Sequence, residues 1–200
     1  MDVYRSISRP GAEVLFKDQK SKFFGYAFPI NGEDDINKCL DTLKEKHPNA
    51  NHYCYAWQLG IERIRYRAND DGEPKNSAGM PIYGQIQSFD LTNVLVVVVR
   101  FFGGVKLGVG GLINAYRSTA RLALEAADVS EFTVELGFEI TFDYPSMNKV
   151  MQLLKREKWN VRSIDQGSQC VIRFSVRKSD KEKALDLLNN LREVQIAITE

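Results

Sequence analysis

Residues 95–112 read LVVVVRFFGGVKLGVGGL, and this stretch decides the fold of the first half of the chain. Leu95 to Arg100 is a continuous run rich in β-branched residues, which predicts a strand buried on both faces of a sheet. Five of the protein's 14 glycines follow between positions 103 and 111. Apolar residues then recur at helical spacing from Leu112 to Ala126. The stretch therefore predicts a buried strand, a glycine-rich turn and a long helix.

The glycine-rich turn is a candidate anion-binding site. Unpaired N–H groups at the start of a helix favour a negatively charged ligand, and Arg100 and Lys106 flank the turn as donors suited to phosphate. Neither the Walker pattern nor G-x-G-x-x-G is present, so nucleotide hydrolysis is not predicted. A tight crossover whose glycines serve only packing is the alternative interpretation. The candidate phosphate- or RNA-binding residues are Arg100, Gly103, Gly104, Lys106, Gly108, Gly110 and Gly111.

Three carboxylates within four residues, at Asp70, Asp71 and Glu73, form a second candidate site. Such a group can hold Mg²⁺ or act as acid and base, although the alternating ligands of a calcium loop are missing. The preferred interpretation is a solvated turn, or a loop whose acids pair with Arg100 or Lys106. No metal site, cofactor or catalytic residue is predicted. The loop residues expected to support the anion site are Asp71, Gly72, Glu73, Ser77 and Gly79.

His52 and Cys54 are secondary candidates on one face of a predicted strand. They are a potential nucleophile and base, or half of a zinc site. The preferred interpretation is a buried thiol beside a hydrogen-bonded histidine, because only one other histidine, His47, is present and no further cysteine lies nearby.

Composition and sequence patterning limit the classes of protein to which the chain can belong. The 200 residues, 44% of them apolar, suit one medium domain or two small ones. The longest apolar run, Val94 to Val99, is far shorter than the ~20 residues of a membrane helix, and no signal-peptide segment is evident. Three widely spaced cysteines fit a reducing compartment, so a cytoplasmic protein without a membrane partner is expected. With 27 basic and 26 acidic residues, any nucleic-acid contact requires a local patch.

The remainder of the first half mixes strands and helices. The polar segment from Asn69 to Gly79 is predicted to be a loop. Periodicity predicts a strand over 23–30, a helix over 36–43, a hairpin of 53–59 and 61–66 around Gly60, and a short helix over 81–87.

The second half predicts a β-α-β-β-α-β order, which is the ferredoxin-like pattern. Residues 132–142 and 170–176 alternate as strands, with a weaker strand at 160–164, helices at 147–154 and 184–191, and a last strand at 194–198. Arg173 and Arg177 share a polar sheet face, while the aromatic residues Phe138, Phe142 and Phe174 lie on the apolar side. The polar face is a basic docking surface for RNA or a protein partner, or an ordinary solvated face.

Several long motifs resemble the signature of the IMPACT family. They are residues 71–82, DGEPKNSAGMPI, and residues 96–112, together with His52-x-Cys54-x-Ala56 and the segment Lys20 to Phe23. The resemblance covers about residues 10–128, and the whole chain is similar to the bacterial YigZ branch. Ser77 and Phe101 depart from the pattern, where the family usually has threonine and often has tyrosine.

The resemblance implies an α+β protein of two domains. Residues 1–129 are expected to have the ribosomal protein S5 domain 2-type fold. Residues 130–200 are expected to form a ferredoxin-like domain similar to domain V of elongation factor G. Both folds recur in proteins that contact ribosomal RNA, and eukaryotic IMPACT members regulate translation initiation.

Three functional hypotheses follow. The leading one is a non-enzymatic, translation-associated protein that binds RNA or the ribosome through the glycine-rich anion site. The alternatives are an enzyme or binding protein for a small phosphorylated metabolite, and a protein–protein adaptor that docks through the second domain. A closed pocket near Arg100 would favour the metabolite, and an open basic groove would favour RNA.

Overall fold

The computed structural model describes residues 2–191 and 194–199. The chain divides into two compact units, Tyr4–Phe132 and Thr133–Glu200, the latter joined by Met1–Val3. The division lies between Phe132 and Thr133, whereas the sequence places it after Val129. Positions 1 and 200, the outer limits of the predicted domains, lie outside the described residues. Both units combine helices with antiparallel sheets, so the predicted α+β class is confirmed.

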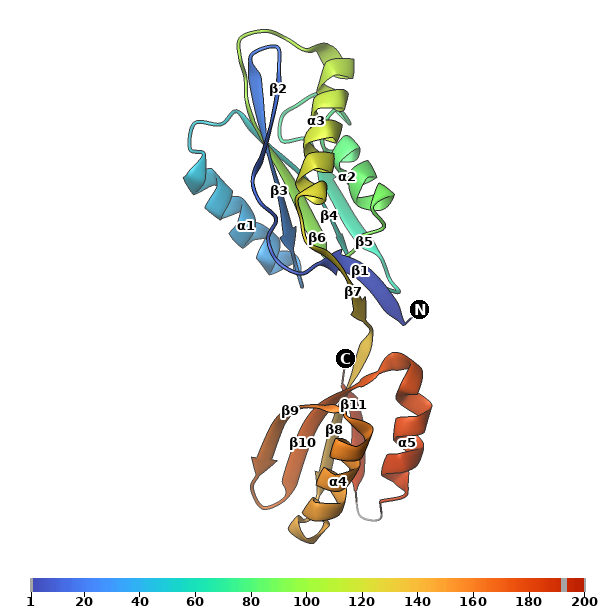
Figure 1. Cartoon of the computed structure of the whole chain (residues 1–200). Helices are drawn as coiled ribbons and strands as arrows, with labels where there is room; N and C mark the ends of the chain where they lie inside the picture. The colour runs from blue at the N-terminus through green and yellow to red at the C-terminus, as the bar shows by residue number, and fades with distance from the viewer. Residues whose placement is uncertain (1, 192–193, 200) are drawn as a thin grey trace. The chain divides into compact units, whose positions relative to one another are not determined.

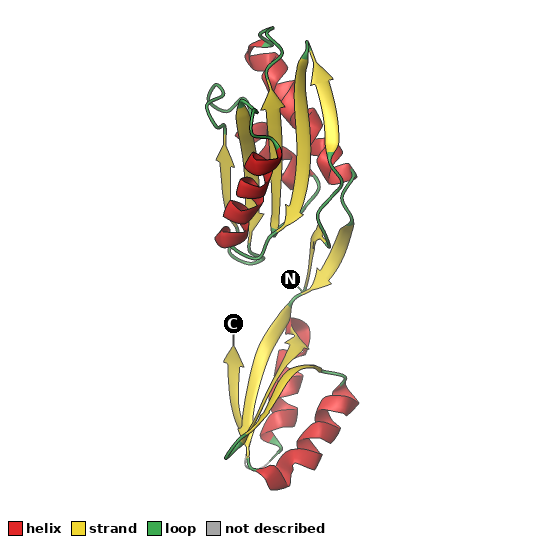
Figure 2. Cartoon of the chain, turned by 90° about the vertical axis from the view of Figure 1, so that its left-hand side faces the viewer, coloured by secondary structure: helices red, strands yellow, loops and turns green. Residues whose placement is uncertain are grey.

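The first unit is built on a five-stranded antiparallel sheet with the order β2-β3-β6-β4-β5. Helices α2 and α3 cover one face of this sheet and α1 covers the other (Figures 1 and 2). The strands are β2 (Val14–Asp18), β3 (Ser21–Pro29), β4 (His52–Leu59), β5 (Arg65–Asn69) and β6 (Val94–Phe101). The helices are α1 (Glu33–Lys46), α2 (Gly79–Ser88) and α3 (Gly108–Glu125).

Strand β6 is the centre of this unit, and its predicted burial on both faces is confirmed. Val94, Val96 and Val98 pack with α2 and α3, and the alternate residues pack with α1. The whole run from Val94 to Val99 is inaccessible to solvent. Because a strand with two buried faces needs apolar residues at every position, the sequence signal here is continuous.

Two strands at the start of the chain, β1 (Val3–Ile7) and β2, were not predicted. β1 pairs with β7 (Val129–Thr133) in a two-stranded sheet. The prediction of one strand over residues 132–142 is therefore wrong, because the chain leaves one sheet and enters another at Val134. There the backbone N–H of Val134 donates to Asp2, and its carbonyl accepts from Lys178.

The predicted hairpin after β4 has a longer turn than expected. Its second strand is β5, and Leu59 pairs with Arg65, so residues 60–64 form the connection instead of Gly60 alone. Helix α2 begins at Gly79, two residues before the predicted start at Pro81. The predicted loop consequently shortens at both ends.

The glycine-rich segment is also divided differently from the prediction. Helix α3 begins at Gly108, so three of the five glycines lie in its first turn and only Gly103 and Gly104 lie in the preceding turn. The first turn has no side-chain cap, which leaves its N–H groups available.

The second unit has the predicted ferredoxin-like order. Its antiparallel sheet runs β11-β8-β10-β9, and its core combines sheet residues with residues of both helices. Phe138, Phe142 and Phe174 are buried in that core, as predicted. The elements are β8 (Glu135–Phe142), α4 (Met147–Glu157), β9 (Asn160–Gln166), β10 (Cys170–Arg177), α5 (Lys181–Asn189) and β11 (Gln195–Thr199).

Among the residues that the structure describes, no helix has the length and apolar character needed to cross a membrane.

Candidate functional site

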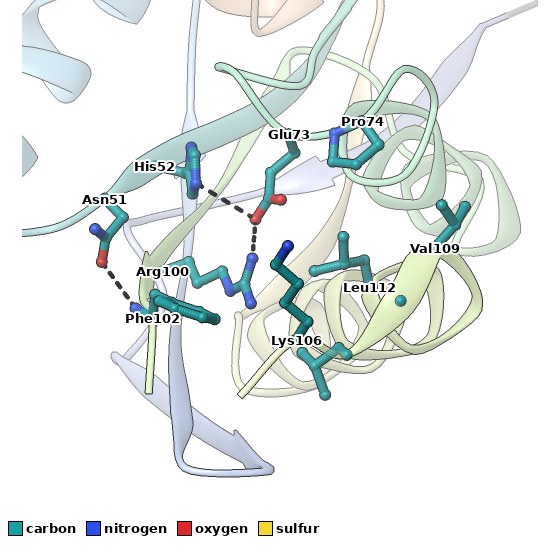
Figure 3. Close-up of a pocket in the computed structure, with 11 residues that line it drawn as sticks. Asn51, His52, Glu73, Pro74, Arg100, Phe102, Lys106, Val109 and Leu112 are labelled. Carbon is teal, nitrogen blue, oxygen red and sulfur yellow. Dashed lines mark hydrogen bonds and ion pairs between the residues drawn. The ribbon is translucent and has the colours of Figure 1, made fainter. Parts of the chain in front are cut away.

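A pocket of about 440 Å³ lies where β6 ends and α3 begins (Figure 3). Its wall combines charged, aromatic and aliphatic side chains from segments far apart in the sequence. The lining residues are Asn51, His52, Glu73, Pro74, Arg100, Phe102, Lys106, Leu107, Gly108, Val109 and Leu112. The pocket therefore brings one residue of the His52–Cys54 pair, one acid of the loop and part of the glycine-rich segment into a single site.

Arg100 and Glu73 form a buried ion pair in the wall of this pocket. Arg100 Nη1 donates to Glu73 Oε1 at 2.5 Å, and the two side chains are 6% and 4% exposed. The guanidinium also lies over the rings of Phe23 and Phe102. Among the described residues, no acceptor reaches the buried Nε of Arg100. Glu73 thus offsets the charge of Arg100 and leaves one donor unsatisfied.

The loop that carries Glu73 is held by its other acids. One oxygen of the Asp70 carboxylate accepts the backbone N–H groups of Ala78 and Gly79, at 3.0 and 2.8 Å, and so caps the start of α2. The Asp71 carboxylate accepts the N–H of Tyr53 on β4 at 2.6 Å. Asp70 and Asp71 therefore fix the loop, and Glu73 alone of the three lines the pocket.

His52 lies directly opposite Arg100 in the register of β4 and β6. Its Nδ1 is 2.8 Å from the carbonyl oxygen of Asp71, which can only accept, so Nδ1 carries a proton. In the neutral ring Nε2 is then an acceptor. Nε2 lies 3.9 Å from Glu73 Oε1 on the side of the pocket (Figure 3).

Cys54 is buried behind the pocket and does not pair with His52. Its Sγ lies 3.0 Å from the carbonyl oxygen of Asp70 and 3.3 Å from the hydroxyl of Tyr116. Burial raises the pKa of the Cys54 thiol well above its ordinary value, and the nearby Glu73 carboxylate also raises it. A thiol held in its neutral form is a poor nucleophile, so the arrangement favours a structural role for Cys54.

Tyr116 completes the cluster and was missed by the sequence analysis. Its hydroxyl donates to Glu73 Oε1 at 2.7 Å, and burial raises the pKa of this hydroxyl, as do the neighbouring Cys54 and Glu73. Tyr116 lies four residues after Leu112 on the apolar face of α3. A tyrosine on an apolar helix face needs a hydrogen-bond partner for its hydroxyl, and this feature of the sequence could have identified Tyr116.

The remaining candidates of the glycine-rich segment do not all line the pocket: Gly103, Gly104, Gly110 and Gly111 lie outside its lining. A Cβ at Gly103 would overlap the backbone carbonyl group of Lys20, and the N–H of Gly103 donates to Ser21 Oγ at 3.2 Å. Lys106 and Gly108 line the pocket at the start of α3. The described residues provide no carboxylate partner for Lys106.

Phe102 lines the pocket and was not among the candidates selected from the sequence. Its side chain is 44% exposed, and its backbone N–H donates to the Asn51 side chain at 2.8 Å. The sequence feature that could have identified it is an aromatic residue directly before a pair of glycines. An exposed ring at such a place presents a flat apolar face to a ligand.

Arg173 and Arg177 belong to the second unit, on β10, and do not line this pocket. Arg173 pairs with Glu139 and Arg177 pairs with Asp2, each at 2.6 Å. The sheet face that carries them is therefore mixed in charge. Docking of RNA or a protein on this face stays a prediction.

Comparisons with known proteins agree on one family. The model of the Impact N-terminal domain matches residues 19–124. An IMPACT family member of Haemophilus influenzae is 35% identical over 177 residues, covering 86% of this chain and 84% of the relative. The protein called IMPACT family member YigZ in Escherichia coli is 29% identical and is matched over 72% of this chain and 73% of its own length.

Solved structures include one with the same fold over the whole chain. It is a crystal structure described as a hypothetical protein, with a TM-score of 0.74 and 23% identity, covering 100% of this chain and 98% of that one. Another is titled as the two-domain translational regulator Yih1, with 32% identity over 59% of this chain and 46% of that chain and a TM-score of 0.39.

Proposed function

The chain belongs to the IMPACT family, and from that premise we propose that it acts in translation by binding RNA, with one unpaired nucleotide held in the Arg100–Glu73 pocket. The family resemblance implies that eukaryotic members regulate translation initiation, which gives the biological setting of the proposal.

One observation carries the proposal: the pocket combines a cation, free helix N–H groups and an exposed aromatic ring. Lys106 and the uncapped first turn of α3 suit one phosphate group. Phe102 offers an exposed ring on which a base can stack.

The charge of the site favours binding of a single nucleotide over binding of a long stretch of nucleic-acid backbone. Glu73 cancels the charge of Arg100, so Lys106 is the remaining full charge among the pocket residues. From the sequence, both Arg100 and Lys106 were expected to contact phosphate. In the proposal Lys106 makes this contact, and Arg100 holds Glu73 and supports the ring of Phe102.

The test is a salt series of binding to ribosomal subunits and to a structured RNA with unpaired nucleotides. Lys106→Ala should weaken binding to all RNA sequences alike and reduce the salt slope by about one. Lys44→Ala is the matched control, because Lys44 is an exposed lysine on α1, on the other face of the sheet. Lack of binding at about 50 mM salt, or an unchanged slope for Lys106→Ala, would overturn the proposal.

A small phosphorylated metabolite is the second candidate ligand. The volume of the pocket lies within the range of small-molecule sites, and His52 beside Glu73 offers acid and base groups. Saturable binding of a free nucleotide by a protein that fails to bind RNA would favour this candidate.

A further inference from the structure

Two hydrogen-bond acceptors face each other in the pocket wall. One is Nε2 of His52, which is an acceptor in the tautomer whose other ring nitrogen donates to Asp71. The other is the carboxylate of Glu73, and Nε2 lies 3.9 Å from its Oε1. That separation is too long for a direct hydrogen bond.

The surrounding residues leave this pair of acceptors without a donor between them. Oε1 of Glu73 accepts from Arg100 and Tyr116, which approach from the interior of the unit. The described residues bring no N–H or O–H group between His52 and Glu73. Because the charge of Glu73 is offset by Arg100, the carboxylate is compatible with an anionic ligand nearby.

A ligand hydroxyl carries one proton and can donate it to only one of the two acceptors. Oε1 of Glu73 already accepts two hydrogen bonds, so Nε2 of His52 is the acceptor that is left for a ligand hydroxyl. The 2′-hydroxyl of a ribose is such a group, because it can donate as well as accept a hydrogen bond. The same pocket holds Lys106 for a phosphate and Phe102 for a base.

We infer that Nε2 of His52 accepts a hydrogen bond from the 2′-hydroxyl of the bound nucleotide, so that the pocket selects a ribonucleotide over its deoxy counterpart. The inference rests on the proposed function for its source of ribonucleotide, which is an RNA strand. It adds a residue-level basis for discrimination between RNA and DNA, which the 2′-hydroxyl makes available.

The experiment compares a single-stranded RNA with the DNA of the same sequence, using the full chain. We expect the wild-type protein to bind the RNA about tenfold more tightly. His52→Leu removes the acceptor and should lower RNA affinity about tenfold while leaving DNA affinity unchanged. His52→Gln, which keeps an acceptor in the side-chain amide, should retain part of the preference.

A second variant separates the two proposals. Lys106→Ala should weaken RNA and DNA binding by the same factor, because phosphate is common to both. Circular dichroism and thermal unfolding of each variant establish that it is folded. Equal binding of RNA and DNA by the wild-type protein would overturn the ribose inference and leave the RNA proposal standing. An RNA preference that survives in folded His52→Leu would overturn the inference as well.

Binding of free nucleotides tests whether the recognised ribose belongs to a free nucleotide instead of an RNA strand. If neither RNA nor DNA binds, the proposed function fails, and calorimetry with adenosine 5′-monophosphate and its 2′-deoxy form then decides the inference. A preference for the ribonucleotide that His52→Leu removes would support hydroxyl recognition of a free nucleotide. Equal binding or no binding of the two nucleotides would overturn it.

Discussion

Glu73 and Arg100 form an ion pair that is almost completely withdrawn from solvent. The atoms Oε1 and Nη1 are 2.5 Å apart, one from the loop before α2 and the other from the end of β6. Removing one partner from a buried pair leaves an uncompensated charge in a medium that solvates it poorly. The pair therefore links the stability of the first unit to the integrity of the pocket.

Glu73→Ala and Arg100→Ala should each lower the free energy of unfolding of the first unit by ~3–5 kcal/mol. The double variant should lose less than the sum, because it leaves no unpaired charge. Urea denaturation followed by the fluorescence of Trp57, in a Trp159→Phe background, measures this unit. Glu125→Ala is the control: it breaks the exposed Arg121–Glu125 pair and should cost no more than ~0.5 kcal/mol. Equal losses for Glu73→Ala and Glu125→Ala would contradict the buried pair.

The strength of the local sequence signal decided which elements could be predicted. The run from Val94 to Val99 is apolar at every position, and the strands of the second unit alternate cleanly, so both were predicted. β1 has only five residues and pairs with β7, more than a hundred positions later. A short strand whose partner is so distant carries no local signal, so β1 was missed.

The site could be predicted in part. Opposite charges in the loop and on β6 suggested the pairing of an acid with Arg100, and the structure selects Glu73. The sequence could not show that the register of β4 and β6 places His52 opposite Arg100. It also could not show that Tyr116 reaches Glu73 from α3, because that contact depends on how the helix packs on the sheet.

Gly103 occupies a position with no room for a side chain, so Gly103→Ala should destabilise the first unit by ~1–3 kcal/mol. The added methyl group would overlap the Lys20 backbone, which cannot move as a flexible side chain does. Gly110→Ala is the matched control. No atom lies within 4 Å of a Cβ there, and alanine in a helix is favoured over glycine by ~1 kcal/mol. Denaturation midpoints should therefore move in opposite directions, and a shift in the same direction would contradict this packing.

His47 gives the first unit a dependence on pH. Its Nε2 lies 2.5 Å from the oxygen of the Tyr26 hydroxyl, whose proton is donated to Glu13. Burial lowers the pKa of His47 below its ordinary value of 6.5, against the opposing effect of Glu13. The folded protein therefore binds this proton less readily than the unfolded chain does, and stability falls as the pH drops below about 6.5.

The His47→Gln variant tests this dependence. Between pH 6.5 and 5 its free energy of unfolding should fall less steeply than that of the wild type, by at most about 1.4 kcal/mol per pH unit, the limit for one proton. Glu13 titrates lower, because hydrogen bonds from Lys46 and Tyr26 lower its pKa below 4.5, so its loss of stability begins at more acidic pH. Parallel curves for the two proteins above pH 5 would exclude a contribution from His47.

Cys54 should be unreactive while the first unit is folded. Burial raises the pKa of its thiol, and its Sγ contacts the Asp70 carbonyl and the Tyr116 hydroxyl, so neither thiolate nor access is available to an alkylating reagent. Iodoacetamide at pH 8, with peptide mapping by mass spectrometry, should modify Cys54 about a hundredfold more slowly in the native protein than in urea. Cys39, which is only half-buried on α1, is the internal control and should react faster than Cys54. Rapid modification of Cys54 in the native protein would show that the cluster of Cys54, Tyr116 and Glu73 opens readily. The pocket next to this cluster would then lack the rigid wall on which recognition of a ligand depends.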